Sequence, residues 1–166
     1  MTNIPKYLYH GSGQSGLKII YPKKTLSKDE YIGDFVFASH NKTLAIMYMT
    51  VKGYYSLMST DTTPAYIVIC SDEEEYKKKN REVSIYKLPS DSFEVTPQEE
   101  LKEYEFVSRK PTAPESSETY PNALTAFSQN NIDVYFVSKP VFDQIVKAGN
   151  KDRDKYLKSV AKYTQN

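Results

Sequence analysis

Three short stretches of the chain carry the residue types that could do chemistry. They are Tyr9-His10-Gly11-Ser12, residues 37–48 and Glu103-Tyr104-Glu105. An imidazole and carboxylates can hold or move protons, a glycine lets the backbone approach a ligand closely, and aromatic rings can stack on a flat ligand. Since the three stretches lie far apart in the chain, they predict a small-molecule site only if the fold brings them together.

The clearest element around these stretches is a strand followed directly by a helix. Residues 35–38 are apolar, aromatic and β-branched, which is typical of a buried strand. Ser39 or Asn41 can then cap a helix, because their side-chain oxygens accept hydrogen bonds from free backbone N–H groups. A strand that breaks straight into a helix places Phe37, Ser39 and Tyr48 near one another, which is a common setting for a small-molecule site.

The other predicted elements are short strands and loops, with helices gathering at the C-terminal end. Strands are expected at residues 6–9, 65–71, 83–88, 102–108 and 132–138, and helices at 120–129, 140–148 and 152–163. Residues 23–33 are polar and irregular, so a loop is expected there. This order of elements favours an α+β fold over alternating βαβ units, and 166 residues suit a single domain over residues 1–166.

Composition argues against several classes of function. The net charge is +1, so no electrostatic footprint indicates bulk binding to nucleic acid or to a membrane, although a specific nucleic-acid target stays open. Cys70 is the only cysteine, and His10 and His40 are the only histidines, so neither a disulfide framework nor a metal centre is expected. The sequence shows no signal-peptide pattern and no apolar stretch that would span a bilayer, which predicts a cytoplasmic protein.

In their order along the chain, these stretches resemble the motifs of a known enzyme class. Tyr9-His10-Gly11-Ser12 matches a Tyr-His-Gly-Thr or His-Gly-Ser motif, and Glu105 within Tyr104-Glu105-Phe106 matches a strand that carries a glutamate. Phe37-Ala38-Ser39, followed by Ala45 and Tyr48, matches an aromatic-small-Ser/Thr step with a tyrosine on the next helix. The chain resembles the mono-ADP-ribosyltransferases of the diphtheria-toxin and poly-ADP-ribose-polymerase class, whose triad is His, Tyr and Glu, over about residues 7–108.

The resemblance implies a fold, a substrate and a set of site residues. The fold would be an ADP-ribosyltransferase-like split β-sheet core with flanking helices and C-terminal helices. The chain would take NAD as a substrate, transfer ADP-ribose to a macromolecular acceptor (protein or nucleic acid) and release nicotinamide without a metal. The implied cofactor-binding residues are His10, Gly11, Ser12, Phe37, Ser39 and Tyr48, and the implied catalytic residues are Glu105, His10 and Tyr48.

Each implied role has a physical basis. The backbone of Gly11 would hold the nicotinamide amide, and His10 would bond a hydroxyl of the adenosine-side ribose. Phe37 and Tyr48 would stack on the nicotinamide ring. Glu105 would accept a bond from the 2′-hydroxyl of the nicotinamide-side ribose and stabilise the positive charge that develops on that sugar.

Two features of the sequence leave alternatives open. Phe37 stands where the class has a tyrosine, so stacking survives but a hydroxyl contact does not. Glu103 and Glu105 are expected on one strand face, and Glu103 is given the acceptor-side role. The competing hypotheses are a non-catalytic nucleotide- or protein-binding module of the same fold and, ranked last because arginine is scarce, a relative that removes a 2′-phosphate from RNA.

Overall fold

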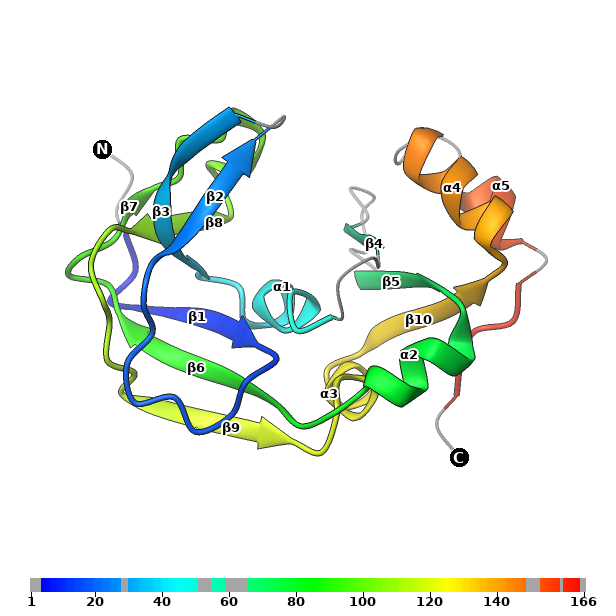
Figure 1. The fold of residues 1–166 in the computed structure, drawn as a ribbon, viewed down its shortest axis with the longest axis horizontal. Coiled ribbons are helices and arrows are strands. Elements are labelled where there is room, and N and C mark those ends of the chain that lie inside the picture. Colours follow the sequence, from blue (N-terminus) through cyan, green and yellow to red (C-terminus); the bar gives the residue numbers. More distant parts are fainter. Residues whose placement is uncertain are drawn as a thin grey trace. The chain divides into compact units, whose positions relative to one another are not determined.

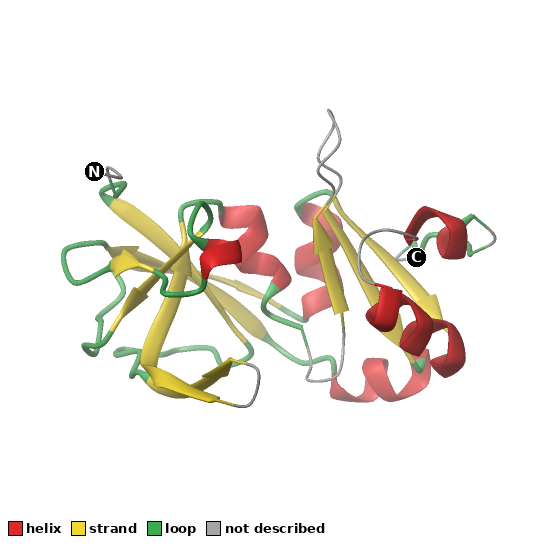
Figure 2. Cartoon of the chain, turned by 90° about the horizontal axis from the view of Figure 1, so that it is seen from above, coloured by secondary structure: helices red, strands yellow, loops and turns green. Residues whose placement is uncertain are grey.

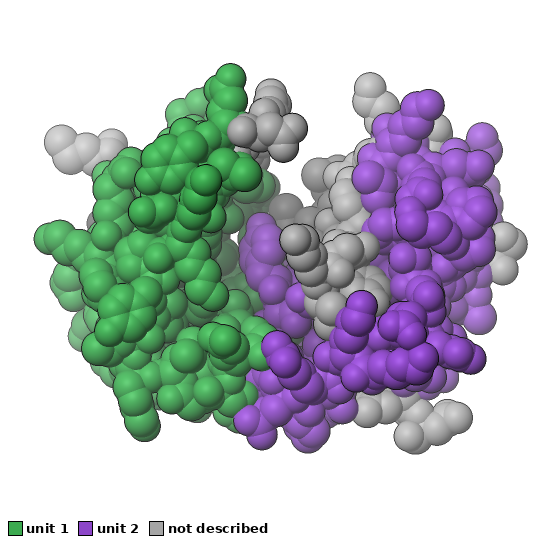
Figure 3. Space-filling view, in the orientation of Figure 1, with its two compact units in different colours: residues 1–46, 84–119 green, residues 47–83, 120–166 purple. Residues whose placement is uncertain are grey.

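The computed structural model describes residues 4–27, 30–50, 55–58, 66–148, 153–158 and 160–164. Within these ranges the protein is a mixed α+β structure whose larger sheet is mostly antiparallel (Figures 1 and 2). The expected α+β class is therefore confirmed. The chain divides into two compact units, residues 1–46 with 84–119 and residues 47–83 with 120–166 (Figure 3). That the two units form one functional domain stays a prediction.

The first unit is built around a large sheet. Its strands are β1 (Tyr7–Ser12), β2 (Lys23–Ser27), β3 (Glu30–Ser39), β6 (Val83–Pro89), β7 (Glu94–Val95), β8 (Glu105–Ser108) and β9 (Ser116–Tyr120). The strands follow the spatial order β7-β8-β3-β1-β6-β9, with β2 paired to β3. Two helices accompany the sheet, the 3-10 helix η1 (Glu99–Leu101) and α1 (Lys42–Met47), which ends where the chain leaves this unit.

Strand alternation assigns the two faces of this sheet. Leu8 lies opposite Leu88, and Ala38 lies opposite Phe106, and all four are buried in one apolar cluster. Successive side chains of a strand point to opposite faces, so the odd-numbered residues of β1 and β3 belong to the other face. The sheet therefore buries one apolar face and leaves the second face to carry different chemistry.

The prediction of a loop at residues 23–33 is wrong. This segment contains β2 and the start of β3, which pair as an antiparallel hairpin with an irregularity between Thr25 and Leu26. Gly33 adopts a φ of +144°, and the ring of Phe35 folds over it. The polar composition misled the prediction because the hairpin is largely exposed and lacks the apolar alternation of a half-buried strand.

A second expected boundary is also wrong. The strand predicted for residues 102–108 begins only at Glu105, because residues 102–104 form a turn closed by the bond from Tyr104 N–H to the Leu101 carbonyl, 2.9 Å. Residues 102–104 resemble β8 in composition, so the sequence gives no sign of the boundary. The turn follows directly from the preceding 3-10 helix. Glu103 and Glu105 therefore do not share a strand face.

The second unit holds a smaller sheet and most of the helices. Its elements are β4 (Tyr55–Met58), β5 (Tyr66–Ser71), α2 (Glu73–Lys79), α3 (Ala123–Gln129), β10 (Ile132–Val137), α4 (Lys139–Ala148) and α5 (Arg153–Leu157). β5 pairs in parallel with β10 and antiparallel with β4. The terminal helix is shorter than the predicted 152–163, and Tyr163 instead donates its N–H to the Val134 carbonyl at 2.8 Å.

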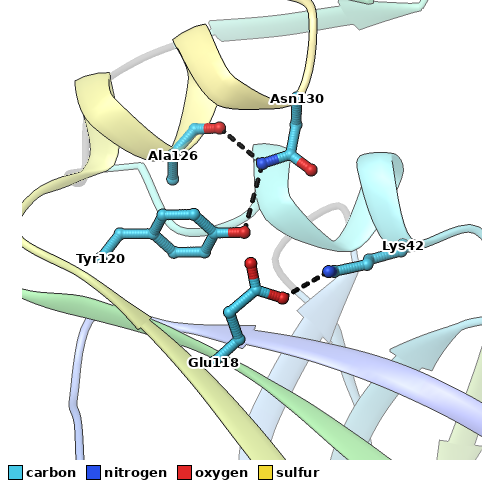
Figure 4. A network of polar contacts seen from close by, with 5 residues as sticks. All are labelled: Lys42, Glu118, Tyr120, Ala126 and Asn130. Carbon is cyan, nitrogen blue, oxygen red and sulfur yellow. Dashed lines mark hydrogen bonds and ion pairs between the residues drawn. The ribbon is translucent and has the colours of Figure 1, made fainter.

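Local polar bonds explain how α3 begins and ends. Asn122 Oδ1 accepts from Thr125 N–H at 2.9 Å, which satisfies a free donor of the first turn. Asn130 Nδ2 donates to the Ala126 carbonyl at 2.8 Å and to the Tyr120 hydroxyl at 3.2 Å (Figure 4).

Within the described residues, no helix has the length and apolar character that crossing a membrane requires.

Candidate functional site

One register row joins three adjacent strands of the first unit. Tyr9 of β1 lies opposite Ser39 of β3, and Ser39 lies opposite Glu105 of β8. Neighbouring strands are about 4.8 Å apart, so the Cα atoms of Tyr9 and Glu105 are roughly 10 Å apart. Residues that are directly opposite share a face, so Ser39 and Glu105 lie on the face opposite the apolar cluster.

The sheet splits between β1 and β3 immediately beyond this row. β1 pairs with β6 through six residues, but it pairs with β3 only at Tyr9 and Ser39. Had the ladder continued, Gly11 would lie opposite Phe37. Instead the Phe37 carbonyl accepts a hydrogen bond from His10 Nδ1 at 2.7 Å. The imidazole thus occupies a position that a backbone N–H would otherwise fill.

The backbone of Gly11 faces this split. The Lys6 carbonyl accepts from Ser90 N–H at 3.2 Å, which shows that the peptide groups of even-numbered residues point toward β6. Peptide groups alternate in direction along an antiparallel strand, so the N–H and C=O of Gly11 point toward β3. They lie beyond the last register pair between β1 and β3, where a ligand could use both groups.

His10 is held as a neutral hydrogen-bonding group. A carbonyl can only accept, so Nδ1 must carry the hydrogen and Nε2 keeps its lone pair. Burial lowers the pKa of His10, the bond to Phe37 opposes this effect, and the positive charge of Lys23 adds to the lowering. His10 lies opposite Tyr86 of the apolar cluster, so its side chain leaves β1 on the face opposite to that of Ser39 and Glu105 and reaches the Phe37 carbonyl at the split. The ring centroids of His10 and Tyr86 are 6.4 Å apart. Nε2 is therefore suited to accept a hydroxyl hydrogen.

Glu105 is a buried carboxylate with one unpartnered oxygen. Its exposed fraction is 7%, and Oε1 has no hydrogen-bond partner among the residues that the structure describes. Burial raises the pKa of Glu105, and a hydrogen bond from the side chain of Thr96 opposes that rise. Thr96 N–H also donates to the Glu105 carbonyl at 3.2 Å, so Thr96 fixes this residue twice. A carboxylate left partly unsatisfied is a natural partner for a ligand hydroxyl or a developing positive charge.

The turn between β3 and α1 resolves which residue caps the helix. Asn41 Oδ1 accepts from Leu44 N–H at 3.1 Å, and the Asn41 carbonyl accepts from Ala45 N–H at 3.1 Å. Ser39 Oγ accepts from Asn41 N–H at 3.1 Å and so shapes the turn before the helix. Asn41 is therefore the cap, and Ser39 is buried on the same row as Glu105.

The remaining predicted site residues are less closely gathered. Phe37 is partly buried and meets Phe35 edge to face, with centroids 5.8 Å apart. Ser12 Oγ accepts from Gln14 N–H at 3.1 Å. Glu103 is exposed in the turn before β8. Tyr48 lies just beyond α1, in the second unit, and is 50% exposed.

Two residues at the site were missed by sequence reasoning. Thr96, which supports Glu105, precedes Pro97 in what reads as an ordinary turn. Tyr86 donates its hydroxyl to the Gln14 carbonyl at 2.7 Å and accepts from Leu17 N–H at 3.1 Å. Tyr86 thus anchors the loop that follows Ser12. The Tyr86 contacts join segments that are distant in the chain, and the Thr96 contact depends on where β8 begins. No local sequence pattern predicts either of them.

The composition of the site points to hydrogen bonding and charge stabilisation by protein groups. Among the residues that the structure describes, no three His, Cys, Asp or Glu side chains gather where they could hold a metal ion. Comparisons with protein-family models, with curated proteins and with solved structures find no match to this chain. The functional assignment therefore depends on the motifs and on the geometry of this site.

Proposed function

We propose that the protein is a mono-ADP-ribosyltransferase that uses NAD as its substrate, releases nicotinamide and transfers ADP-ribose to a macromolecular acceptor. One observation carries the proposal. The sheet opens beside the Gly11 backbone, and two strands away lies a buried carboxylate, Glu105, whose Oε1 has no hydrogen-bond partner among the described residues; the His10 side chain enters the split from the opposite face. The ADP-ribosyltransferase-like fold of the first unit is part of the same proposal, supported by the split between β1 and β3.

The residues of the site supply the steps that this transfer requires. The bond between C1′ of the ribose and the nicotinamide nitrogen breaks, and its electron pair leaves with nicotinamide, which becomes neutral. Glu105 stabilises the positive charge that develops on the ribose. The acceptor's nucleophile forms the new bond to C1′, and its proton passes to the Glu105 carboxylate or to water.

Binding would be divided between backbone and side chains. The N–H and C=O of Gly11 fit a carboxamide, which needs one acceptor and one donor. Nε2 of His10 can accept a hydrogen bond from a ribose hydroxyl, because Nδ1 carries the hydrogen and donates it to the Phe37 carbonyl. The ring of Phe37 provides one stacking surface. The role of Tyr48 as a second stacking residue is part of the proposal.

A non-catalytic binding module is the second candidate. It is favoured by the character of the two proposed stacking residues. Phe37 lacks the hydroxyl of the tyrosine that the enzyme class has there, and Tyr48 is half exposed. Such a module would use the same split and the same Gly11 backbone to bind a nucleotide. It would have no need for an unpartnered buried carboxylate, which is why transfer is the better-supported candidate.

The test is release of nicotinamide from labelled NAD by the purified protein. Glu105→Gln keeps the size of the side chain and removes its charge, and we expect release to fall by about 10²-fold or more. Glu103→Gln is the matched control, because it makes the same change at an exposed position two residues away. We expect this control to release nicotinamide at the wild-type rate.

The possible results separate the two candidates. If wild type releases no nicotinamide but NAD raises its melting temperature, the binding module is the correct assignment. If Glu105→Gln stays folded and as active as wild type, the catalytic role of Glu105 is wrong. If NAD is neither cleaved nor bound, both candidates fail.

A further inference from the structure

Two segments of the first unit form an exposed basic surface. Residues 18–24 contain Lys18, Lys23 and Lys24, residues 109–112 contain Arg109 and Lys110, and neither segment contains Asp or Glu. Each of these five cations is exposed. We call the two segments together the basic surface. Its local excess of positive charge contrasts with the net charge of +1 for the whole chain.

The basic surface is held together by backbone bonds. Ile20 N–H donates to the Thr112 carbonyl and Thr112 N–H donates to the Ile20 carbonyl, both at 2.9 Å. Ile20 and Thr112 are themselves buried. The two segments therefore lie side by side at Ile20 and Thr112. Lys23 shares a face of the hairpin with Phe35, and Lys24 is on the other face with Asp34.

Among the described residues, two of the five cations lie near or opposite an acidic residue. Arg109 Nε lies 3.5 Å from Glu94 Oε1, and Lys24 lies opposite Asp34 in the hairpin. Lys18, Lys23 and Lys110 have no ion pair in the described part of the chain. The surface therefore keeps an uncompensated positive charge that an anionic partner could meet.

Large apolar side chains are exposed on the first of these segments and on the hairpin that follows it. Tyr21 is 61% exposed between Lys18 and Lys23, and Tyr31, on the strand paired with β2, is 60% exposed. Leu26 lies opposite Tyr31 and is also exposed. Exposed aromatic rings interleaved with cations are the combination by which proteins bind single-stranded nucleic acid, with bases on the rings and phosphates on the cations.

Lys23 and Arg109 join the basic surface to the face of β3 that carries Ser39. Lys23 lies opposite Phe35, and the guanidinium of Arg109 lies 4.6 Å from the centroid of the same ring. Phe35 is on the same face of β3 as Phe37 and Ser39. From Phe35 to Ser39 is four residues, or about 13 Å along the strand. A polymer that docks on the basic surface could therefore present one of its groups at the site.

We propose that the acceptor is a single-stranded nucleic acid, which docks its phosphates on the basic surface and stacks bases on Tyr21 and Tyr31. The role of the nucleic acid as acceptor rests on the proposed function, but its binding to the basic surface does not require NAD. A duplex fits less well, because its bases are stacked on one another and leave no free face for a ring.

The test is fluorescence anisotropy with 5′-fluorescein-labelled 12-nucleotide strands of deoxythymidine and of uridine, without NAD. We expect at least one strand to bind, a DNA duplex of the same length to bind less tightly, and binding to weaken with salt. For Lys23→Ala with Lys110→Ala, we expect the slope of log affinity against log salt to fall by about 1.4, since each phosphate contact contributes about 0.7. Neither lysine is in an ion pair with another described residue, so folding should be preserved.

Matched variants separate specific docking from general charge. Lys147→Ala with Lys158→Ala removes the same charge from exposed positions in the second unit and should leave the affinity unchanged. Tyr21→Phe keeps a stacking ring and should bind like wild type. Tyr21→Leu removes the ring and should bind about fivefold or more weakly.

The outcomes distinguish this inference from the proposed function. If neither strand binds at low salt, or if the two lysine pairs weaken binding equally, the inference is wrong. Equal binding by Tyr21→Leu and Tyr21→Phe would contradict base stacking. Release of nicotinamide without nucleic-acid binding overturns only the acceptor class, whereas nucleic-acid binding without release overturns only the enzyme.

Discussion

Replacing Glu105 by glutamine should stabilise the protein while it abolishes catalysis. Glu105 is 7% exposed, and its Oε1 has no hydrogen-bond partner in the described part of the chain, so its charged form is poorly accommodated in the folded state. Burial raises the pKa of Glu105, with the Thr96 hydrogen bond opposing the rise. Glutamine has nearly the same shape, keeps an oxygen for Thr96 and carries no charge. The substitution therefore removes the main cost of this position.

The sign of the pH dependence follows from the direction of the pKa shift. Because the folded pKa of Glu105 lies above the unfolded pKa, its contribution to stability is complete below the unfolded pKa and is lost as pH rises through the folded pKa. Glu105→Gln has no proton to lose at this position. The advantage of the variant over wild type should therefore be smallest at acidic pH and should grow toward neutral pH.

The expected magnitude is the cost of burying the charge alone, on the order of 1 kcal/mol, because the side-chain NH2 of glutamine takes the place of Oε1 and still lacks a partner. For a chain of this size, each kcal/mol corresponds to a change of about 2–4 °C in melting temperature. Thermal unfolding followed by circular dichroism at pH 4, 6 and 8 measures the difference directly. Glu103→Gln, at an exposed position, should change the unfolding free energy by less than about 0.5 kcal/mol at every pH.

A variant that is less stable than wild type at pH 8 would refute this reasoning. So would an advantage that does not change with pH, because it would show that the charge of Glu105 is not the cause. Combined with the nicotinamide assay, the expected pattern is a protein that is harder to unfold and inactive. This pattern is the signature of a residue kept for chemistry at the expense of stability.

Two further substitutions test the framework around the site. Tyr86→Phe removes the hydroxyl that bonds the Gln14 carbonyl and Leu17 N–H, so we expect a loss of about 1–3 kcal/mol and faster hydrogen exchange at Leu17; an unchanged exchange rate would contradict the anchoring role. Gly33→Ala would place a Cβ 2.5 Å from the Cζ of Phe35 at a φ of +144°, so we expect a loss of at least about 1 kcal/mol in denaturant unfolding, and a neutral effect would show that the hairpin relaxes freely.

The strands with strong apolar patterns could be predicted from the sequence, and the exposed hairpin could not. Val83–Pro89 and Ile132–Val137 lie within one residue of their predicted bounds, because buried side chains alternate or run continuously there. β2 and the start of β3 were expected to be a loop. Their pairing is between mostly polar and exposed residues, so the information lies in the partner strand and not in either segment alone.

The sequence by itself determined the chemistry that this protein can offer: one imidazole beside a glycine, a strand that breaks into a helix, and a glutamate ahead of an apolar strand. Only the tertiary structure decided how they are used. It separated Glu105 from the exposed Glu103, opened the sheet beside Gly11, and committed one nitrogen of His10 to the Phe37 carbonyl. Residue types and spacing along the chain set what a side chain can donate or accept, whereas burial and partners depend on contacts between distant segments, which no local pattern encodes.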